Sequence, residues 1–280
     1  MKGDFHIHTN ASDGDYEIKE IIFRAKQNNL THIAITDHNT FGNHNLENVE
    51  IKDLIIIPGV EFDVERDIDN GTKMHILGLN INVNNAQLKK YFTKYHKRNL
   101  KLVLKLYKKI HKIYGVKIKE SSLERTSKLS YYGIINKLAY KVIEQGLSTK
   151  KQRELADDIG VYLNKKRFNF HNEKLVLKLI KKAGGQSVLA HPCSMKLNND
   201  DLDRRVRCLV NLGLNGIEIY HPNIKPEQTE FYKSLAKKYN LFTSGGSDFH
   251  RYDERPDVFV SDEDINKVSI LSVIKDVKKF

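Results

Sequence analysis

The chain has 280 residues, of which 40% are hydrophobic, and a formal net charge of +12. This length exceeds that of a small stapled domain and suits one α/β domain, since a β/α barrel needs about 250 residues. Two cysteines without a Cys-x-x-Cys pair predict a reducing, cytoplasmic setting, and the lack of a signal peptide or of an apolar run of ~20 residues predicts no membrane partner.

Short apolar runs alternate with amphipathic segments, which is the order typical of α/β folds. Predicted strands cover residues 3–8, 32–36, 54–57 with 60–64, 73–80, 187–190, 216–219 and 241–244. Predicted helices between and after them cover residues 16–28, 173–183, 200–212, 226–239 and 265–278. Pro226 is well placed at a helix start, because its missing N–H would be unpaired there in any case.

Residues 86–170 do not follow this alternation of strands and helices. Their sequence predicts helices at 87–114, 132–145 and 150–160 with no strand between them. We predict one domain made of residues 1–85 and 171–280, with residues 86–170 as a helical insertion that caps the site. The alternative is a set of outer helices without a substrate role. Residues 86–119 hold 12 Lys/Arg and no Asp/Glu, which indicates either nucleic-acid contact or a solvated helix face in a lysine-rich chain.

The first two predicted strands end in residues that bind metals well. His6 and His8 are two positions apart and share one face of a strand, and the turn that follows returns Asp13 toward them. The second strand runs into Asp37-His38, and a buried charge of this kind needs a partner. We expect His38 to be a ligand and Asp37 either to orient an imidazole or to ligate directly.

Four later segments repeat this pattern. Glu61 follows Pro-Gly-Val as a carboxylate able to bridge two ions, and His75 lies on the next strand, where a hydrogen-bonded core histidine is the alternative. His191 follows a strand, and Asp248 and His250 again share a face after a glycine pair. Six histidines and three carboxylates without a thiolate suit two or three divalent ions that hold and activate water.

The other histidines divide into two groups. His221 follows the strand at 216–219, where it is either a phosphate ligand or proton donor, or a hydrogen-bonded surface histidine. Five more are placed on helices or loops and assigned no role: His32, His44, His96, His111 and His171.

Five ordered motifs resemble those of the PHP-domain (polymerase and histidinol phosphatase) metallophosphoesterases. They are Asp4-Phe5-His6-Ile7-His8-Thr9, Ile35-Thr36-Asp37-His38-Asn39, Gly59-Val60-Glu61, Ala190-His191-Pro192 and Gly246-Ser247-Asp248-Phe249-His250. The resemblance runs from residue 1 to about 257 and implies a distorted, TIM-like (β/α)7 barrel with a site for three manganese, iron or zinc ions. The positions matching the family's ligands are His6, His8, Asp13, His38, Glu61, His75, His191, Asp248 and His250.

Within that family the chain looks most like the stand-alone branch acting on nucleotides, and it departs from that branch at one point. The insertion there usually carries an Arg-Pro-His segment that holds substrate phosphate, but this chain shows Ile135-Asn136-Lys137. Lysine is a point charge and cannot replace the bidentate fork of arginine directly. Lys137, Arg125, Lys128 and His221 are therefore the candidate substrate-binding residues.

The resemblance implies a hydrolase of phosphate esters that uses a hydroxide bridging two ions, with Asp37 and His221 as catalytic side chains. The expected substrate is a nucleoside 3′,5′-bisphosphate or the 5′ end of a short RNA, and no obligate protein partner is evident. One alternative is a small-molecule phosphatase similar to histidinol phosphatase. The other is a nucleic-acid-binding module whose metal site is only structural, although structural sites tend to be closed and four-coordinate.

Overall fold

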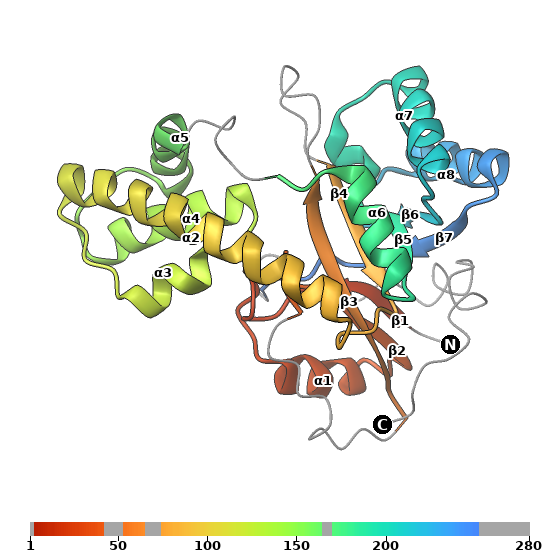
Figure 1. The fold of residues 1–280 in the computed structure, drawn as a ribbon, viewed down its shortest axis with the longest axis horizontal. Helices are drawn as coiled ribbons and strands as arrows, with labels where there is room; N and C mark the ends of the chain where they lie inside the picture. The colour runs from red at the N-terminus through yellow and green to blue at the C-terminus, as the bar shows by residue number, and fades with distance from the viewer. Residues whose placement is uncertain (1–2, 42–52, 65–73, 164–169, 252–280) are drawn as a thin grey trace. The chain divides into compact units, whose positions relative to one another are not determined.

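The computed structural model describes residues 3–41, 53–64, 74–163 and 170–251. The chain divides into two compact units, and each is described by itself (Figure 1). Unit 1 is Met1–Asn85 with His171–Phe280, and unit 2 is Ala86–Phe170. The helix predicted at residues 265–278 lies outside the described residues.

Within the described residues, seven strands form one sheet in which they follow each other in sequence order. They are β1 (Gly3–Ile7), β2 (His32–Ile35), β3 (Ile55–Val64), β4 (Met74–Leu79), β5 (Gln186–Leu189), β6 (Gly216–Tyr220) and β7 (Phe242–Gly245). The two segments predicted at 54–57 and 60–64 are one strand. Strand β3 pairs with β2 up to Pro58 and with β4 from Gly59, so the proline lies where one ladder ends and the other begins.

The direction of β4 is where the structure departs from the predicted barrel. Strand β4 is antiparallel to both β3 and β5, whereas every other neighbouring pair in the sheet is parallel. The α/β class is therefore confirmed, and a regular (β/α)7 barrel is not. The sheet is nevertheless curled, because Phe249, just after β7, accepts a hydrogen bond from the backbone N–H of His8 at 2.9 Å.

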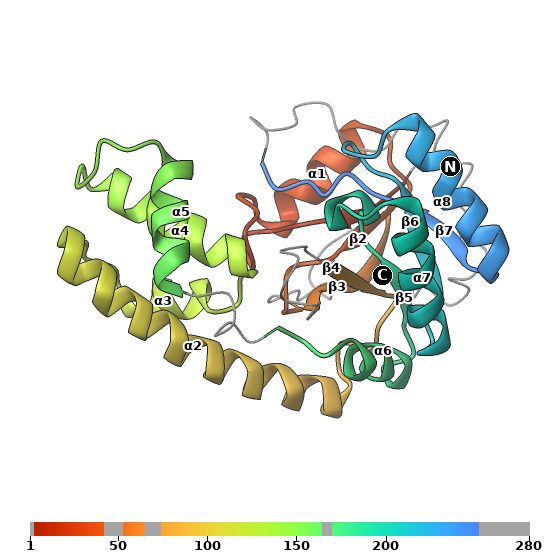
Figure 2. The ribbon, with the colours of Figure 1, turned by 90° about the horizontal axis from the view of Figure 1, so that it is seen from above.

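Four α-helices in the described part of unit 1 flank the sheet (Figures 1 and 2). They are α1 (Ile18–Gln27), α6 (Glu173–Lys182), α7 (Asn199–Asn211) and α8 (Pro226–Tyr239), which all match predicted helices. Helix α1 buries Ile21, Ile22 and Ala25 against Ile33 and Ile56 of the sheet, and helices α6 to α8 lie beside β5 to β7. These layers hold the strands in register and leave the strand ends to carry polar side chains.

Unit 2 is helical and has a core of its own. It holds α2 (Ala86–Tyr114), α3 (Glu120–Thr126), α4 (Tyr131–Glu144) and α5 (Gln152–Leu163), of which α3 was not predicted. Val103, Ile134 and Leu155 are among the fully buried residues of one cluster that joins α2, α4 and α5. Among the described residues no helix is long and apolar enough to cross a membrane.

Candidate metal centre

All nine residues proposed as ligands from the sequence come together at one end of the sheet in unit 1. Their nitrogen and oxygen atoms form overlapping groups within 4.8 Å, each able to hold an ion. The groups are His8, Asp13, His38 and His250; His6, His8, Glu61 and Asp248; His38, Asp63 and His75; and Glu61, His75 and His191. Each of the nine residues belongs to at least one group. Asp63, which was not predicted as a ligand, also belongs to one.

Glu61 lies at the centre of the cluster, and its two oxygen atoms face different histidines. Oε1 is 2.7 Å from Nδ1 of His75 and 3.0 Å from Nε2 of His191. Oε2 is 3.2 Å from Nε2 of His8, 3.2 Å from Nδ1 of His38 and 3.3 Å from Nε2 of His6. Burial alone would raise the pKa of Glu61, but the surrounding histidines hold it well below its usual value. Each oxygen of Glu61 would therefore be available to a different metal ion.

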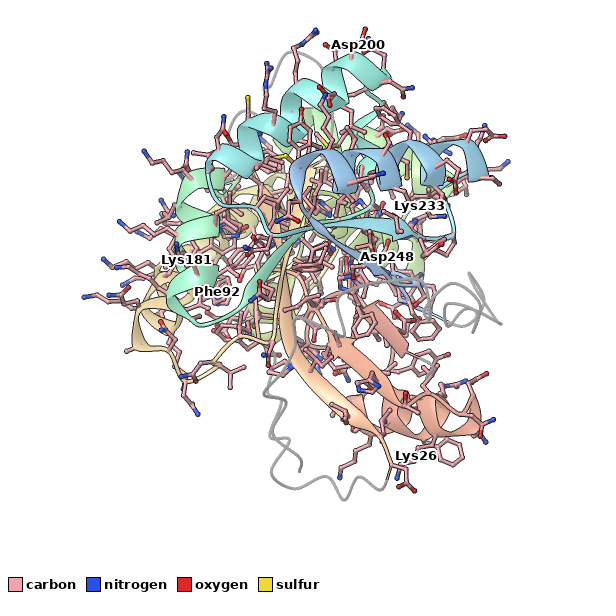
Figure 3. The ribbon with its side chains drawn as sticks, turned by 90° about the vertical axis from the view of Figure 1, so that its right-hand side faces the viewer. Lys26, Phe92, Lys181, Asp200, Lys233 and Asp248 are labelled. Carbon is pink, nitrogen blue, oxygen red and sulfur yellow. The ribbon has the colours of Figure 1, made fainter. Side chains whose placement is uncertain are left out.

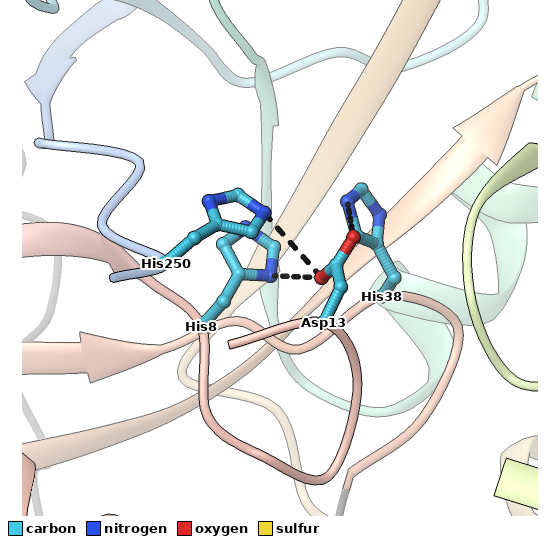
Figure 4. A group of neighbouring side chains, drawn as sticks. All are labelled: His8, Asp13, His38 and His250. Atoms are coloured by element: carbon cyan, nitrogen blue, oxygen red, sulfur yellow. Dashed lines mark ion pairs between the residues drawn. The ribbon is translucent and has the colours of Figure 1, made fainter. Parts of the chain in front are cut away.

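Asp13 is the centre of the group drawn in Figure 4. Its Oδ1 is 3.4 Å from Nε2 of His250 and 3.7 Å from Nδ1 of His8, while its Oδ2 is 3.7 Å from Nε2 of His38. The residues come from three separate segments, which follow β1, β2 and β7 (Figure 4). Burial opposes ionisation of Asp13, but the facing histidines hold its pKa well below the usual range.

Asp37 makes contacts that hold the turn carrying Asp13. Its Oδ1 accepts the backbone N–H of Thr9 at 2.8 Å and the hydroxyl of Ser12 at 2.6 Å, and its Oδ2 accepts the hydroxyl of Thr9 at 2.8 Å. It belongs to none of the four groups. These bonds give Asp37 a positioning part, and its direct participation in catalysis stays a prediction.

His75 reaches the cluster by a route that the sequence did not predict. It is the second residue of β4, not its last. Because β4 is antiparallel to its neighbours, the beginning of this strand lies at the edge where the parallel strands end. The antiparallel strand therefore places its histidine among side chains supplied by the ends of parallel strands.

Asp63 was missed in the sequence, although it lies on the same face of β3 as Glu61. Its Oδ1 is 3.1 Å from Nε2 of His75 and 3.5 Å from Nδ1 of His38. Its Oδ2 accepts a hydrogen bond from Asn39 at 3.1 Å, and Oδ1 of Asn39 lies 2.6 Å from Nε2 of His171. His171, which had no predicted role, thus supports this chain of contacts; the alternation of acidic residues along β3 was the available clue.

Glu218 is a second buried carboxylate that sequence reasoning did not assign. It lies on β6 with no exposed surface, and its Oε2 accepts the backbone N–H of His191 at 2.6 Å. Its Oε1 is 3.3 Å from Nδ1 of His6, which leaves Nε2 of His6 directed at Glu61 and Asp248. A carboxylate behind a ligating histidine fixes its tautomer and ring orientation.

His221 lies at the margin of the cluster with a defined tautomer. Its Nδ1 accepts the backbone N–H of Asn223 at 3.1 Å, so the proton of the neutral ring is on Nε2. That Nε2 is 3.5 Å from Oδ2 of Asp248. His221 thus directs an N–H toward the cluster without belonging to any of the four groups.

The donor set fits divalent metal ions. Six buried atoms of the cluster make no hydrogen bond within the described residues: Nε2 of His6, Nε2 of His8, Oδ1 of Asp13, Nδ1 of His38, Oε2 of Glu61 and Oδ1 of Asp63. Buried polar atoms are rarely left unsatisfied, and metal coordination would satisfy these. Burial alone would lower the pKa of His8, but Asp248 and Glu61 raise it to about 10, which shows how strongly the carboxylates attract positive charge.

The candidate substrate-binding residues other than His221 belong to unit 2. Arg125 lies on α3 and Lys137 on α4, both exposed, and Lys128 lies between these helices. Nζ of Lys137 is 5.8 Å from the centre of the Tyr140 ring. The roles of these three residues in holding phosphate, and of unit 2 as a cap, stay predictions.

An α/β fold whose curled sheet gathers histidines and carboxylates at one end is the arrangement expected of a hydrolytic metalloenzyme. The model of the PHP domain matches residues 4–171, and the chain belongs to this family. The sequence-based prediction of a hydrolytic phosphoesterase of this family is confirmed.

Relatives support this assignment over most of the chain. The chain is 26% identical over 259 residues to the 5'-3' exoribonuclease Rnm of Escherichia coli, covering 89% of this chain and 85% of that protein. It is 26% identical over 255 residues to the phosphoribosyl 1,2-cyclic phosphate 1,2-diphosphodiesterase of Eggerthella lenta. That alignment covers 89% of this chain and 94% of the relative. The fold matches a Bifidobacterium adolescentis structure described as a metal-dependent phosphoesterase, with a TM-score of 0.75 and 21% sequence identity. The match covers 95% of this chain and 94% of that structure.

Proposed function

We propose that this protein is a metal-dependent hydrolase of nucleotide phosphate esters, which removes nucleotides from the 5′ end of short RNA or dephosphorylates nucleoside 3′,5′-bisphosphates. The observation that carries this proposal is the cluster of six histidines and three carboxylates in one unit, of which five are buried and four partly buried. Similarity to an enzyme named as a 5′–3′ exoribonuclease supports the choice of substrate.

The nine cluster residues would hold two or three divalent ions, with Glu61 and His8 each shared between two groups. Such ions, when bound, lower the pKa of a coordinated water toward ~7 and neutralise phosphate oxygens. Asp37 and Glu218 would keep the ligands in place through the hydrogen bonds they accept. His221 would donate a hydrogen bond from Nε2 to a phosphate oxygen of the substrate, since its Nδ1 already accepts the backbone N–H of Asn223.

The proposal is tested by measuring the turnover of a panel of substrates with protein whose metal content has been determined. It compares 5′-phosphorylated short RNA, adenosine 3′,5′-bisphosphate, histidinol phosphate and phosphoribosyl 1,2-cyclic phosphate, each with and without a chelator. We expect metal-dependent release of mononucleotides or phosphate from the first two at the highest kcat/KM. Preference for the cyclic diester, which the Eggerthella lenta relative's name suggests as the second candidate, would contradict the substrate assignment. Absence of all turnover with metal bound would favour a structural site.

Replacement of Glu218 by alanine is expected to weaken metal binding by about 10–100-fold, because His6 loses the partner of Nδ1 and the His191 N–H loses its acceptor. Isothermal titration of metal-free protein with Mn²⁺ or Zn²⁺ measures this change directly. Glu218→Gln keeps one acceptor oxygen and should lie between the alanine variant and the original protein. Equal affinity in all three proteins would show that Glu218 does not position the histidines.

A further inference from the structure

Helix α2 carries two stripes of opposite character on opposite faces. Its buried residues follow each other at intervals of three or four positions. They are Leu88, Phe92, Tyr95, Asn99, Val103, Leu106 and Ile110. Two positions after each buried residue stands a lysine, and these seven form what we call the lysine stripe: Lys90, Lys94, Lys97, Lys101, Lys105, Lys108 and Lys112. Two helical positions correspond to about 200°, so the lysine stripe points directly away from the buried face.

The lysine stripe forms a continuous row of positive charge. Figure 2 shows α2 as one unbroken helix, and all seven lysines are exposed. From Lys90 to Lys112 the row extends about 33 Å at 1.5 Å per residue, with about one charge per turn. Helix α2 contains no Asp or Glu, and none of the seven lysines forms an ion pair within the described part of the chain.

A lysine-rich composition alone does not explain this row, because the other α-helices also carry acidic residues and several of their lysines form ion pairs. Lys233 contacts Glu230 at 2.7 Å, and Lys238 of α8 contacts Asp203 of α7 at 2.7 Å. Unit 2 also pairs Lys150 with Asp158, at 2.6 Å. Figure 3 shows Lys181 and Asp200 at the periphery of unit 1, on two different helices. Among the α-helices in the described part of the chain, α2 alone contains basic residues and no acidic ones.

A row of lysines matches the backbone of a nucleic acid better than a membrane surface. Lysine is a point charge that neutralises phosphate without reading bases, and several such contacts add up along a strand. A membrane-bound amphipathic helix must insert its apolar face into lipid. The apolar face of α2 is buried within the protein, and Val103, Leu106 and Ile110 belong to the core of unit 2.

We propose that the lysine stripe is an RNA-binding surface that holds the phosphate backbone of a strand longer than the few nucleotides on which the metal centre acts. This inference rests on the proposed function for its choice of RNA as the polyanion. It assigns binding, not chemistry, to α2, and it predicts that long RNA binds more tightly than a mononucleotide and does so in a salt-dependent manner.

The test uses the full chain with Lys94, Lys97, Lys101 and Lys105 changed to glutamine, whose helix propensity is close to that of lysine. The matched control changes four exposed lysines of unit 1 to glutamine and so loses the same charge: Lys19, Lys26, Lys178 and Lys181. Fluorescence anisotropy with a labelled 20-nucleotide RNA in chelator measures affinity at several salt concentrations without cleavage. Circular dichroism verifies that both variants are folded.

We expect the α2 variant to lose at least about tenfold in affinity at 0.1 M salt and its salt slope to fall by about 3, since each phosphate contact on a single strand contributes about 0.7. The control should bind like the original protein, and both variants should hydrolyse adenosine 3′,5′-bisphosphate at the original rate. Equal losses in both variants, no loss in either, or binding to phosphatidylserine vesicles without binding to RNA would each overturn the proposal. RNA binding through α2 in a protein that hydrolyses no substrate of the panel would support this inference while rejecting the proposed function.

Discussion

Replacement of Glu61 by glutamine is expected to lower turnover by on the order of a thousandfold and to reduce the metal content of the purified protein. The side chain keeps its size but loses its negative charge and one of its two ligand oxygens. Those oxygens divide five histidines between them, with His75 and His191 on one side and His6, His8 and His38 on the other. An amide cannot serve both sides, so a bridging position fails even where the fold survives.

The measurements are kcat on the best substrate of the panel and metal stoichiometry by elemental analysis. Asp4→Asn is the matched control, because it is also a change from a buried carboxyl to an amide beside His6. Burial raises the pKa of Asp4 to about 7, and its Oδ1 accepts two backbone N–H groups, as an amide oxygen can. A Glu61→Gln protein with full metal content and undiminished turnover would remove Glu61 from the proposed centre.

The sequence predicted the strands of this fold better than their directions. Apolar runs bounded by polar residues located all seven strands, because burial of a strand leaves a local pattern. The antiparallel course of β4 leaves no such pattern, since it depends on which neighbours the strand meets in the folded sheet. Periodicity likewise predicted α2 but not α3, whose seven residues are too few to show a stripe.

The candidate ligands were recognisable because histidines in pairs, such as His6 and His8, break an otherwise apolar strand. Their supports were not, because each depends on a contact between distant segments. Glu218 lies within a strand and meets His6 across 212 residues of sequence, and His171 meets Asn39 across 132. His32 begins β2, in agreement with the strand predicted at residues 32–36 and against the assignment of this histidine to a helix or loop. A single sequence shows which residues can bind a metal, while only the fold shows what holds them.

Replacement of Gly246 by alanine is expected to destabilise the protein by about 3 kcal/mol and to disturb the metal centre as well. A Cβ atom at this position would overlap Cβ of His6 and lie 2.7 Å from its backbone nitrogen. Strand β1 has little room to move, because it is paired with β2 and because Asp4 accepts the N–H groups of both His6 and Ser247. The overlap therefore falls on a candidate ligand and on backbone that cannot yield.

Gly245→Ala provides the matched control at the preceding residue. Its Cβ atom would lie 3.0 Å from Cβ of Tyr220 and 3.2 Å from the carbonyl oxygen of Tyr220, a close contact that small shifts can relieve. We expect a loss of about 1 kcal/mol there, with metal binding retained. Urea denaturation gives the free energy of unfolding of each protein, and metal titration shows whether His6 keeps its position. If Gly246→Ala is as stable as Gly245→Ala and binds the full complement of metal, close packing of the β7 end against His6 does not shape this centre.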